Sequence, residues 1–244
     1  MPAVELTPER RDEVVRSGEL EVLGRMAWSS NATLLVNAAL DGDEVRAIYK
    51  PVQGERPLWD FPDGTLAGRE VAAYVLSDFL GWDIVPFTVM RNGPYGPGMV
   101  QHFVDHDPDE HYFTLLERHA ETFRRFAVFD LLANNTDRKG GHCLEERGTG
   151  RVYGIDHGLT FHAHPKLRTV IWDFGGEEID AALLADVERV VADLRVGGPL
   201  ASGLADLIAP HEVGALADRA EEVLALGHLP IADEGYHSVP WPLV

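Results

Sequence analysis

The sequence predicts an α+β protein with two lobes, and three observations lead to that fold class. In the first part of the chain, short apolar runs of strand length alternate with turn residues, as in a small antiparallel sheet. The later part carries longer apolar repeats of helical period. The chain of 244 residues, 45% of them hydrophobic, is long enough to bury one sizeable core. We therefore expect a β-rich N-terminal lobe at residues 1–104, a helical C-terminal lobe at residues 105–244 and a cleft between them.

The N-terminal lobe is expected to be a small antiparallel sheet that carries one helix, with a short helix before it. Thr7 and Pro8 begin the short helix, and Gly18 ends it. Apolar residues at helical spacing predict the second helix over 68–80, after a loop at 51–65 that is rich in Pro, Gly and Asp. Apolar runs predict strands at residues 20–25, 33–40, 45–49, 84–90 and 99–104.

Helices dominate the expected C-terminal lobe, and one β-hairpin interrupts them. The hairpin is predicted at residues 142–145 and 152–155, directly after a polar loop at 134–141. Apolar residues of helical period predict helices at residues 115–119, 123–132, 179–194 and 211–226. The connection between the lobes is expected at about residues 99–106.

Composition and charge exclude several classes of function. Forty acidic residues against 21 basic ones give a net charge of −19, which is unsuited to binding nucleic acid or an anionic membrane surface. The chain has no uninterrupted apolar stretch of the ~18 residues that a membrane span needs, and its N-terminus has no apolar signal-peptide core. A lone cysteine, Cys143, suits a reducing compartment. We expect a cytoplasmic protein without a nucleic-acid partner or stable membrane association.

Lysine is rare in this chain, which uses arginine for almost every positive charge. The lysines are Lys50, Lys139 and Lys166, against 18 arginines. A lysine ammonium is a compact point charge that a planar guanidinium does not replace geometrically. Each lysine is therefore a candidate for a specific contact, although Lys50, at the end of a predicted strand, also fits an ordinary solvated charge.

Two aspartates lie where phosphoryl transfer would need them. Asp137 lies in the polar loop at 134–141, and Asp156 ends the second strand of the predicted hairpin. A loop and a strand end joined by a hairpin share one face of the expected cleft. Phosphoryl transfer needs one carboxylate to orient and deprotonate a hydroxyl and another to hold a metal on the phosphates. Taken singly, each aspartate also fits an ordinary turn former.

The motifs around these aspartates resemble those of a known enzyme family. Asn135-Thr136-Asp137-Arg138 followed by Ile155-Asp156-His157-Gly158-Leu159 resembles the catalytic and metal-binding motifs of type II phosphatidylinositol 4-kinases. The chain is more broadly similar to the phosphatidylinositol 3-/4-kinase-like superfamily, which includes HipA-type protein kinases, and to small actinobacterial phosphatidylinositol-kinase-like proteins. The resemblance covers roughly residues 20–175. It implies a two-lobed protein-kinase-like fold that uses ATP and Mg²⁺ or Mn²⁺.

The resemblance also implies roles for individual residues. Asp137 corresponds to the catalytic-loop aspartate and Asp156 to the metal-binding aspartate. Lys50 corresponds to the lysine that contacts phosphate. Glu70 is placed to pair with it as the kinase helix glutamate does, and equally fits a solvated helix face. Arg138 or Lys139 is a candidate for neutralising the transferred phosphoryl group. The cofactor-binding candidates are completed by two further segments, which are Ser29, Ser30 and Asn31 as a phosphate loop, and Gln101, His102 and Phe103 beside the adenine.

His142 departs from the family pattern, because these kinases normally carry asparagine there as a second metal ligand. Imidazole is a poorer ligand than an amide or carboxylate oxygen for Mg²⁺, whereas Mn²⁺ accepts it. We expect His142 to hold the metal with Asp156, the alternative being that His142 only packs at the strand start. Asp173-Phe174-Gly175 spells the metal motif of ordinary protein kinases, but Asp156 is the preferred ligand. A metal shared by His162 and His164 is disfavoured.

The sequence thus predicts an ATP- and metal-dependent phosphotransferase. We favour a hydroxyl acceptor on a protein or a soluble small molecule over a phosphoinositide, because the strong negative charge opposes binding to an anionic membrane. Two alternatives stay open. One is a non-catalytic nucleotide-binding regulator that kept the fold, and the other is a nucleotidyl transferase that uses the same residues.

Overall fold

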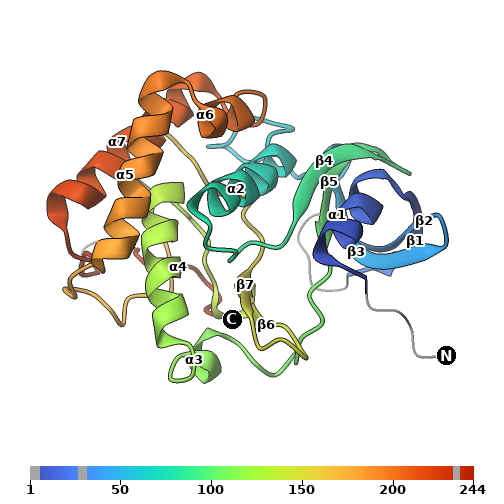
Figure 1. Ribbon diagram of the computed structural model, residues 1–244, viewed down its shortest axis with the longest axis horizontal. Helices are drawn as coiled ribbons and strands as arrows, with labels where there is room; N and C mark the ends of the chain where they lie inside the picture. The colour runs from blue at the N-terminus through green and yellow to red at the C-terminus, as the bar shows by residue number, and fades with distance from the viewer. Residues whose placement is uncertain (1–5, 27–31, 233–236) are drawn as a thin grey trace.

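The computed structural model describes residues 6–26, 32–232 and 237–244. An antiparallel five-stranded sheet lies on one side of the molecule and most of the helices lie on the other (Figure 1). The strands are β1 (Glu19–Arg25), β2 (Leu34–Leu40), β3 (Asp43–Pro51), β4 (Thr88–Gly93), β5 (Gly96–His102), β6 (Cys143–Glu145) and β7 (Val152–Gly154). The α-helices are α1 (Pro8–Ser17), α2 (Leu66–Leu80), α3 (Tyr112–Leu115), α4 (Ala120–Ala133), α5 (Ala181–Val196), α6 (Pro199–Leu204) and α7 (Pro210–Leu226). The expected α+β class is confirmed.

The two faces of the sheet have different partners. The strand order is β1-β2-β3-β5-β4, and every neighbouring pair is antiparallel. Helix α1 covers one face, where Val15 packs in a cluster with Tyr49 and Val100. Helix α2 meets the other face, where Val71 packs against Met99. Because side chains alternate along a strand, the neighbours of Tyr49 on β3 point toward α2.

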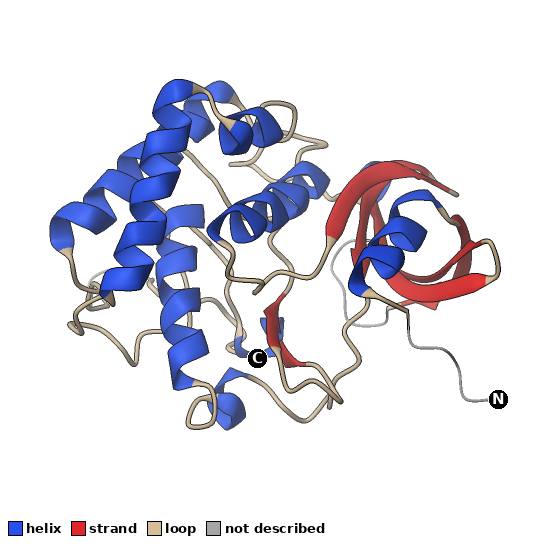
Figure 2. Cartoon of the chain, viewed as in Figure 1, coloured by secondary structure: helices blue, strands red, loops and turns tan. Residues whose placement is uncertain are grey.

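Helix α2 belongs to both halves of the molecule. Its residues Ala72, Leu76 and Leu80 are buried in the large core formed mainly by α4, α5 and α7. Figure 2 shows α2 between the sheet and the remaining helices. The lobe boundary near residue 104 therefore remains a prediction, since the helix expected to belong to the sheet also contributes to the helical core. None of the described helices is long and apolar enough to cross a membrane.

The structure differs from the sequence-based expectation at three elements. The helix expected at residues 115–119 lies earlier, as α3 at Tyr112–Leu115. Strand β4 begins at Thr88, although an apolar run starts at Ile84. The amides of Ile84 and Val85 donate to the Ser77 hydroxyl at 3.1 and 3.3 Å, so they are not available to a β-ladder. Helix α6 was not expected, because its six residues are too few to show a helical period.

Candidate active site

Lys50 is held by two carboxylates that come from distant parts of the chain. It lies one residue before the end of β3, on the face that meets α2. Its Nζ lies 2.5 Å from Oε1 of Glu70 and 2.7 Å from Oδ1 of Asp156. Burial alone would lower the pKa of Lys50, but the Asp156 and Glu70 carboxylates outweigh it and raise that pKa. The ammonium therefore stays charged at neutral pH.

Glu70 connects Lys50 to the segment that follows β7. It lies in the second turn of α2, and its side chain is only 2% exposed. While Oε1 accepts from Lys50, Oε2 accepts from the backbone N–H of His157 at 2.8 Å. Burial raises the pKa of Glu70, and the Lys50 ammonium opposes that rise. The expected contact between Lys50 and Glu70 is present.

Asp156 occupies a strained turn directly beyond β7. Its φ of 59° lies in the left-handed region, which costs little for aspartate compared with most residues. The next residue, His157, donates its backbone N–H to the Glu70 carboxylate. The Lys50 ammonium lowers the pKa of Asp156 far below its usual range, so its carboxylate is ionised.

The loop that follows α4 is built around a buried aspartate. Asn134 ends α4 in a left-handed conformation with a φ of 47°. Asn135 then donates from Nδ2 to Oδ1 of Asp130 at 3.0 Å and accepts the backbone N–H of Asp137 at its own Oδ1, also at 3.0 Å. Thr136 donates its hydroxyl to the Leu159 carbonyl at 3.0 Å. These bonds fix the backbone of the loop and leave the Asp137 side chain outside it.

Asp137 and Lys139 form an adjacent pair. Oδ2 of Asp137 lies 2.7 Å from Nζ of Lys139, and their side chains are 24% and 21% exposed. Both are thus reachable from solvent, as groups that meet an acceptor and a phosphate must be. Two of the three lysines, Lys50 and Lys139, therefore lie beside the two aspartates singled out from the sequence.

Arg138 does not lie where it could neutralise a transferred phosphoryl group. Its side chain is completely buried and paired with Asp130, with Nη2 to Oδ1 at 2.9 Å. The guanidinium also stacks on Phe126, 5.2 Å from the ring centroid, and contacts Nε2 of His157 at 2.7 Å. A guanidinium fixed inside the core does not reach a transferred phosphoryl group, so Arg138 supports the loop from behind.

His142 lies beside Asp156, as the sequence suggested. Its Nε2 is 3.5 Å from Oδ2 of Asp156, and its Nδ1 is buried and has no hydrogen-bond partner in the described part of the chain. Burial lowers the pKa of His142, so the ring is neutral near pH 7 and offers a lone pair. Among the described residues, no three His, Cys, Asp or Glu side chains converge in a group able to hold a metal. Asp156 and His142 therefore form a pair and are not part of a larger cluster of such side chains among the described residues.

The remaining cofactor-binding candidates are placed less favourably. Ser29, Ser30 and Asn31 lie outside the described residues. Gln101 is buried and donates from Nε2 to the Thr88 hydroxyl at 2.8 Å. The His102 ring points to the α1 side, where Nε2 lies 3.5 Å from Oδ1 of Asp12. The Phe103 ring stacks under the Arg46 guanidinium at 4.9 Å. These three side chains are thus engaged with other parts of the protein, and an adenine contact by this segment stays a prediction.

The other motifs noted in the sequence lie apart from this cluster. Asp173 accepts the Tyr112 hydroxyl at 2.6 Å, and Phe174 is buried in the helical core. The His162 ring contacts the neighbouring backbone, with Nδ1 3.0 Å from the backbone nitrogen of His164. Asp173 is therefore a structural hydrogen-bond acceptor.

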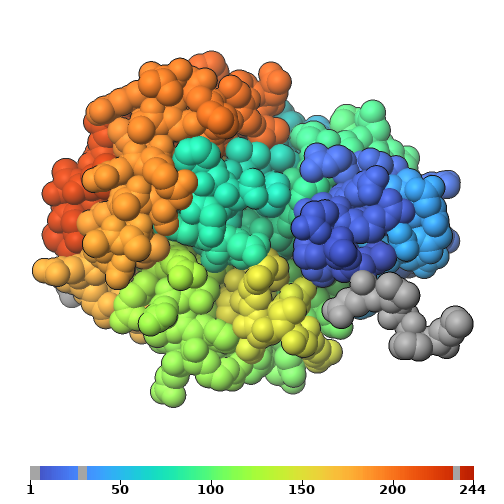
Figure 3. Space-filling model, in the orientation of Figure 1, coloured from blue at the N-terminus to red at the C-terminus, as the bar shows by residue number. Residues whose placement is uncertain are grey.

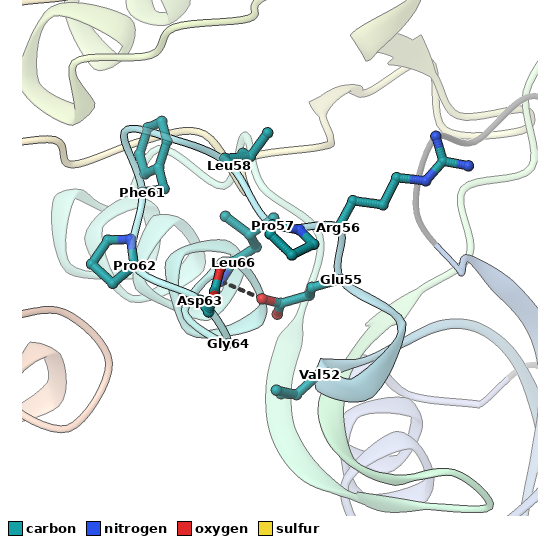
Figure 4. Close-up of a pocket in the computed structure, with 10 residues that line it drawn as sticks. All are labelled: Val52, Glu55, Arg56, Pro57, Leu58, Phe61, Pro62, Asp63, Gly64 and Leu66. Atoms are coloured by element: carbon teal, nitrogen blue, oxygen red, sulfur yellow. Dashed lines mark hydrogen bonds between the residues drawn. The ribbon is translucent and has the colours of Figure 1, made fainter.

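A pocket of about 180 Å³ lies beside the start of α2, and neither Asp137 nor Asp156 lines it. It is formed by the loop between β3 and α2 (Figure 4). The Glu55 carboxylate accepts the backbone N–H groups of Leu66 and Ala67 at 3.1 and 2.8 Å. The N-terminus of α2 is thus capped by the chain itself. Neither Lys50 nor Asp137 lines this pocket.

Sequence reasoning missed two buried charges that support the site. Asp130 anchors Arg138 and Asn135, and Arg69 pairs with Glu212 on α7 at 2.8 Å. A charged residue between apolar neighbours, as Asp130 is between Phe129 and Leu131, is a usable signal, because charges are rarely fully buried unless paired. The partner of such a charge is not readable from spacing.

Comparisons with known proteins agree with this geometry. The family model for phosphatidylinositol 3- and 4-kinases matches residues 67–186. Protein Rv2133c of Mycobacterium tuberculosis is 44% identical to this chain in an alignment 270 residues long. The alignment covers 96% of this chain and 96% of that protein.

Two solved structures share the fold at 12% sequence identity. The Helicobacter pylori proinflammatory kinase CtkA has a TM-score of 0.54 and covers 87% of this chain and 93% of its own. Hydra Fam20, solved with sugar, has a TM-score of 0.52 and covers 91% of this chain and 89% of its own. The matched region contains Glu70, Asp137 and Asp156, so residues 67–186 form a domain of the phosphatidylinositol 3- and 4-kinase family.

Proposed function

We propose that this protein is an ATP- and metal-dependent phosphotransferase that acts on a hydroxyl acceptor. The observation that carries the proposal is the contact of Lys50 with both Glu70 and Asp156. In kinases, a strand lysine paired with a helix glutamate contacts the phosphates, and an aspartate beyond the catalytic loop holds the metal. Three segments far apart in the sequence meet here in that arrangement.

The catalytic roles follow from exposure and charge. In the transfer step, the acceptor oxygen forms a bond to the γ-phosphorus of ATP, and the bond from that phosphorus to the bridging oxygen breaks. ADP leaves with the electron pair, and the acceptor proton passes to the exposed carboxylate of Asp137. Lys139, beside Asp137, stabilises the charge on the moving phosphoryl group, while Lys50 holds the phosphates of the nucleotide.

The residues present fit a divalent cation. The ionised carboxylate of Asp156 lies next to the neutral ring of His142, whose buried Nδ1 has no hydrogen-bond partner among the described residues. When bound, the cation neutralises charge on the phosphate oxygens. Two protein ligands suffice for an ion that takes its remaining ligands from phosphates and water. The imidazole favours Mn²⁺ over Mg²⁺.

The acceptor is proposed to be a protein or a small molecule. Each Lys or Arg near an anionic membrane contributes about 1 kcal/mol of binding, whereas this chain has a net charge of −19. A hydroxyl on a phosphoinositide would have to be reached against that repulsion. A hydroxyl that is free in solution, or lies on a protein surface, carries no such penalty.

A non-catalytic nucleotide-binding regulator is the second candidate. His142, where the family carries asparagine, favours it, because the site then lacks an oxygen ligand that Mg²⁺ prefers. Nucleotidyl transfer would use the same side chains with ATP bound in the opposite direction.

Release of ADP from ATP, measured with Mg²⁺ and separately with Mn²⁺, tests the proposal. We expect turnover in the wild type, a loss of about 100-fold or more in Asp137→Asn, and wild-type turnover in Asp173→Asn. The asparagine keeps the shape of Asp137 but takes no proton. Wild-type turnover in Asp137→Asn, or its loss in Asp173→Asn, would show that the assignment of the two motifs is wrong.

A further inference from the structure

Helix α2 is fixed to the helical half of the molecule by a buried ion pair. Arg69, next to Glu70, is 1% exposed, and its Nη2 lies 2.8 Å from Oε1 of Glu212 on α7. The Arg69 guanidinium also stacks on Phe61, 4.8 Å from the ring centroid. Glu212 is held from its other side, since its Oε2 accepts the backbone N–H of Ala209 at 3.0 Å. Both charged side chains are therefore buried from solvent.

Arg69 and Glu70 each form a hydrogen bond with the backbone of residues 157–160. The backbone carbonyl of Thr160 accepts Nη1 of Arg69 at 2.7 Å, and the backbone N–H of His157 donates to Glu70 at 2.8 Å. Between these points, the Thr160 hydroxyl donates to the His157 carbonyl at 2.7 Å and closes the turn. Consecutive residues of α2 thus clamp the segment that begins with Asp156.

Gly68 gives independent evidence of the same docking. A Cβ at this position would lie 2.6 Å from the backbone oxygen of Leu207, in the turn between α6 and α7. Backbone atoms cannot move aside as a flexible side chain can, so this close approach needs glycine. The space-filling view shows α2, in teal, in contact with the orange helices over a broad front (Figure 3).

We propose that Arg69, through Glu212 and Thr160, is a positioning residue that keeps Glu70 paired with Lys50. In protein kinases, movement of the corresponding helix makes and breaks the lysine–glutamate pair and thereby controls activity. Here Arg69 ties the helix to Glu212 and Thr160 while Glu70 contacts Lys50, so we expect the phosphate site to assemble without helix movement. The consequence for catalysis rests on the proposed function, whereas the docking itself does not.

Hydrogen exchange at the His157 amide tests the docking without reference to activity. The full chain is compared as wild type, Arg69→Met and Glu212→Gln, with mass spectrometry of peptides that cover residues 156–161, α2 and α5. Arg195→Met is the matched control, because it removes an arginine from an exposed ion pair with Glu221, whose Nη2–Oε1 distance is 2.7 Å.

The wild-type peptide 156–161 should be protected without nucleotide, and the non-hydrolysable analogue AMP-PNP with Mn²⁺ should slow its exchange by less than about 2-fold. Arg69→Met should speed its exchange by about 10-fold or more, together with that of α2, while α5 keeps its wild-type rate. Arg195→Met should change neither. Equal exchange in all variants, a uniform rise across every helix, or a large slowing of the wild type by AMP-PNP would each overturn the proposal.

Kinetics supply a second measurement and separate the proposal from the proposed function. Arg69→Lys retains one donor and should raise the KM for ATP less than Arg69→Met, for which about 10-fold is expected with a smaller change in kcat. This variant also keeps the test available if Arg69→Met does not fold. Absent turnover in the wild type would contradict the proposed function and leave the exchange result to decide the docking. Normal turnover together with unchanged exchange in the variants would overturn the docking alone.

Discussion

Replacing Lys50 by methionine tests whether Lys50 and Glu70 form one electrostatic unit. Their side chains are 18% and 2% exposed, and Nζ lies 2.5 Å from Oε1. Removal of one partner of a buried ion pair typically costs about 3–5 kcal/mol, because the other charge is left without compensation. The carboxyl of Glu70 can limit that cost by taking up a proton.

Proton uptake sets the size of the loss and its dependence on pH. Protonation of a carboxyl with an ordinary pKa of about 4.3 costs about 1.4 kcal/mol per pH unit above that value, or about 3.7 kcal/mol near pH 7. In Lys50→Met, the pKa of Glu70 in the folded state lies above its unfolded value, so the destabilisation grows as the pH rises. We expect a loss of about 3 kcal/mol near pH 7 and about 1.5 kcal/mol near pH 5.5.

Urea unfolding of four proteins at both pH values measures these quantities. The proteins are the wild type, Lys50→Met, Glu70→Gln and the double variant. The double variant should be more stable than Lys50→Met near pH 7, because it no longer buries an uncompensated carboxylate. Losses that add within about 0.5 kcal/mol, with no dependence on pH, would refute the idea that the two side chains act as a unit.

Three further predictions concern histidines and the cysteine. His142→Asn should shift the preference for Mn²⁺ over Mg²⁺ in ADP release toward Mg²⁺, and an unchanged preference would show that His142 is not a ligand. Burial lowers the pKa of His102 to about 4, so below about pH 6.5 the unfolded chain binds a proton that the folded protein does not, and the free energy of unfolding falls. His102→Gln should flatten that fall in urea unfolding, whereas a profile parallel to that of the wild type would count against it. Burial raises the pKa of the Cys143 thiol to about 12, so a colorimetric disulfide reagent near pH 7.5 should react quickly only after unfolding, and fast reaction of the native protein would contradict the buried position.

The parts of the site that could be predicted are those where chain order fixes position. Lys50 comes at the end of a strand, and Asp156 comes at the end of a hairpin that starts just after Asp137. Residues at the ends of strands lie at the edge of a sheet, where functional side chains are often found. The chain order therefore predicts that Lys50, Asp137 and Asp156 lie near one another. His142, at the start of the same hairpin, lies beside Asp156 for this reason.

The parts that escaped prediction depend on packing between distant residues. Arg138 read as a free cation, but Asp130, one turn before the end of α4, draws its guanidinium into the core at 2.9 Å. Arg69 carries no signal in the local sequence, although it meets Glu212 at 2.8 Å. Nothing in the local sequence shows which carboxylate a buried guanidinium will meet, because that depends on how the helices cross.

Intact-mass spectrometry after incubation with ATP and Mn²⁺ tests the central claim most directly, with hydroxyl acceptors on the protein itself or in an added protein mixture. Phosphoryl transfer adds about 80 Da per acceptor, whereas nucleotidyl transfer adds about 329 Da. We predict an increase of about 80 Da with the wild type that is absent with Asp137→Asn and unaffected in Asp173→Asn. An increase of about 329 Da, or an 80 Da increase that persists in Asp137→Asn, would contradict the account.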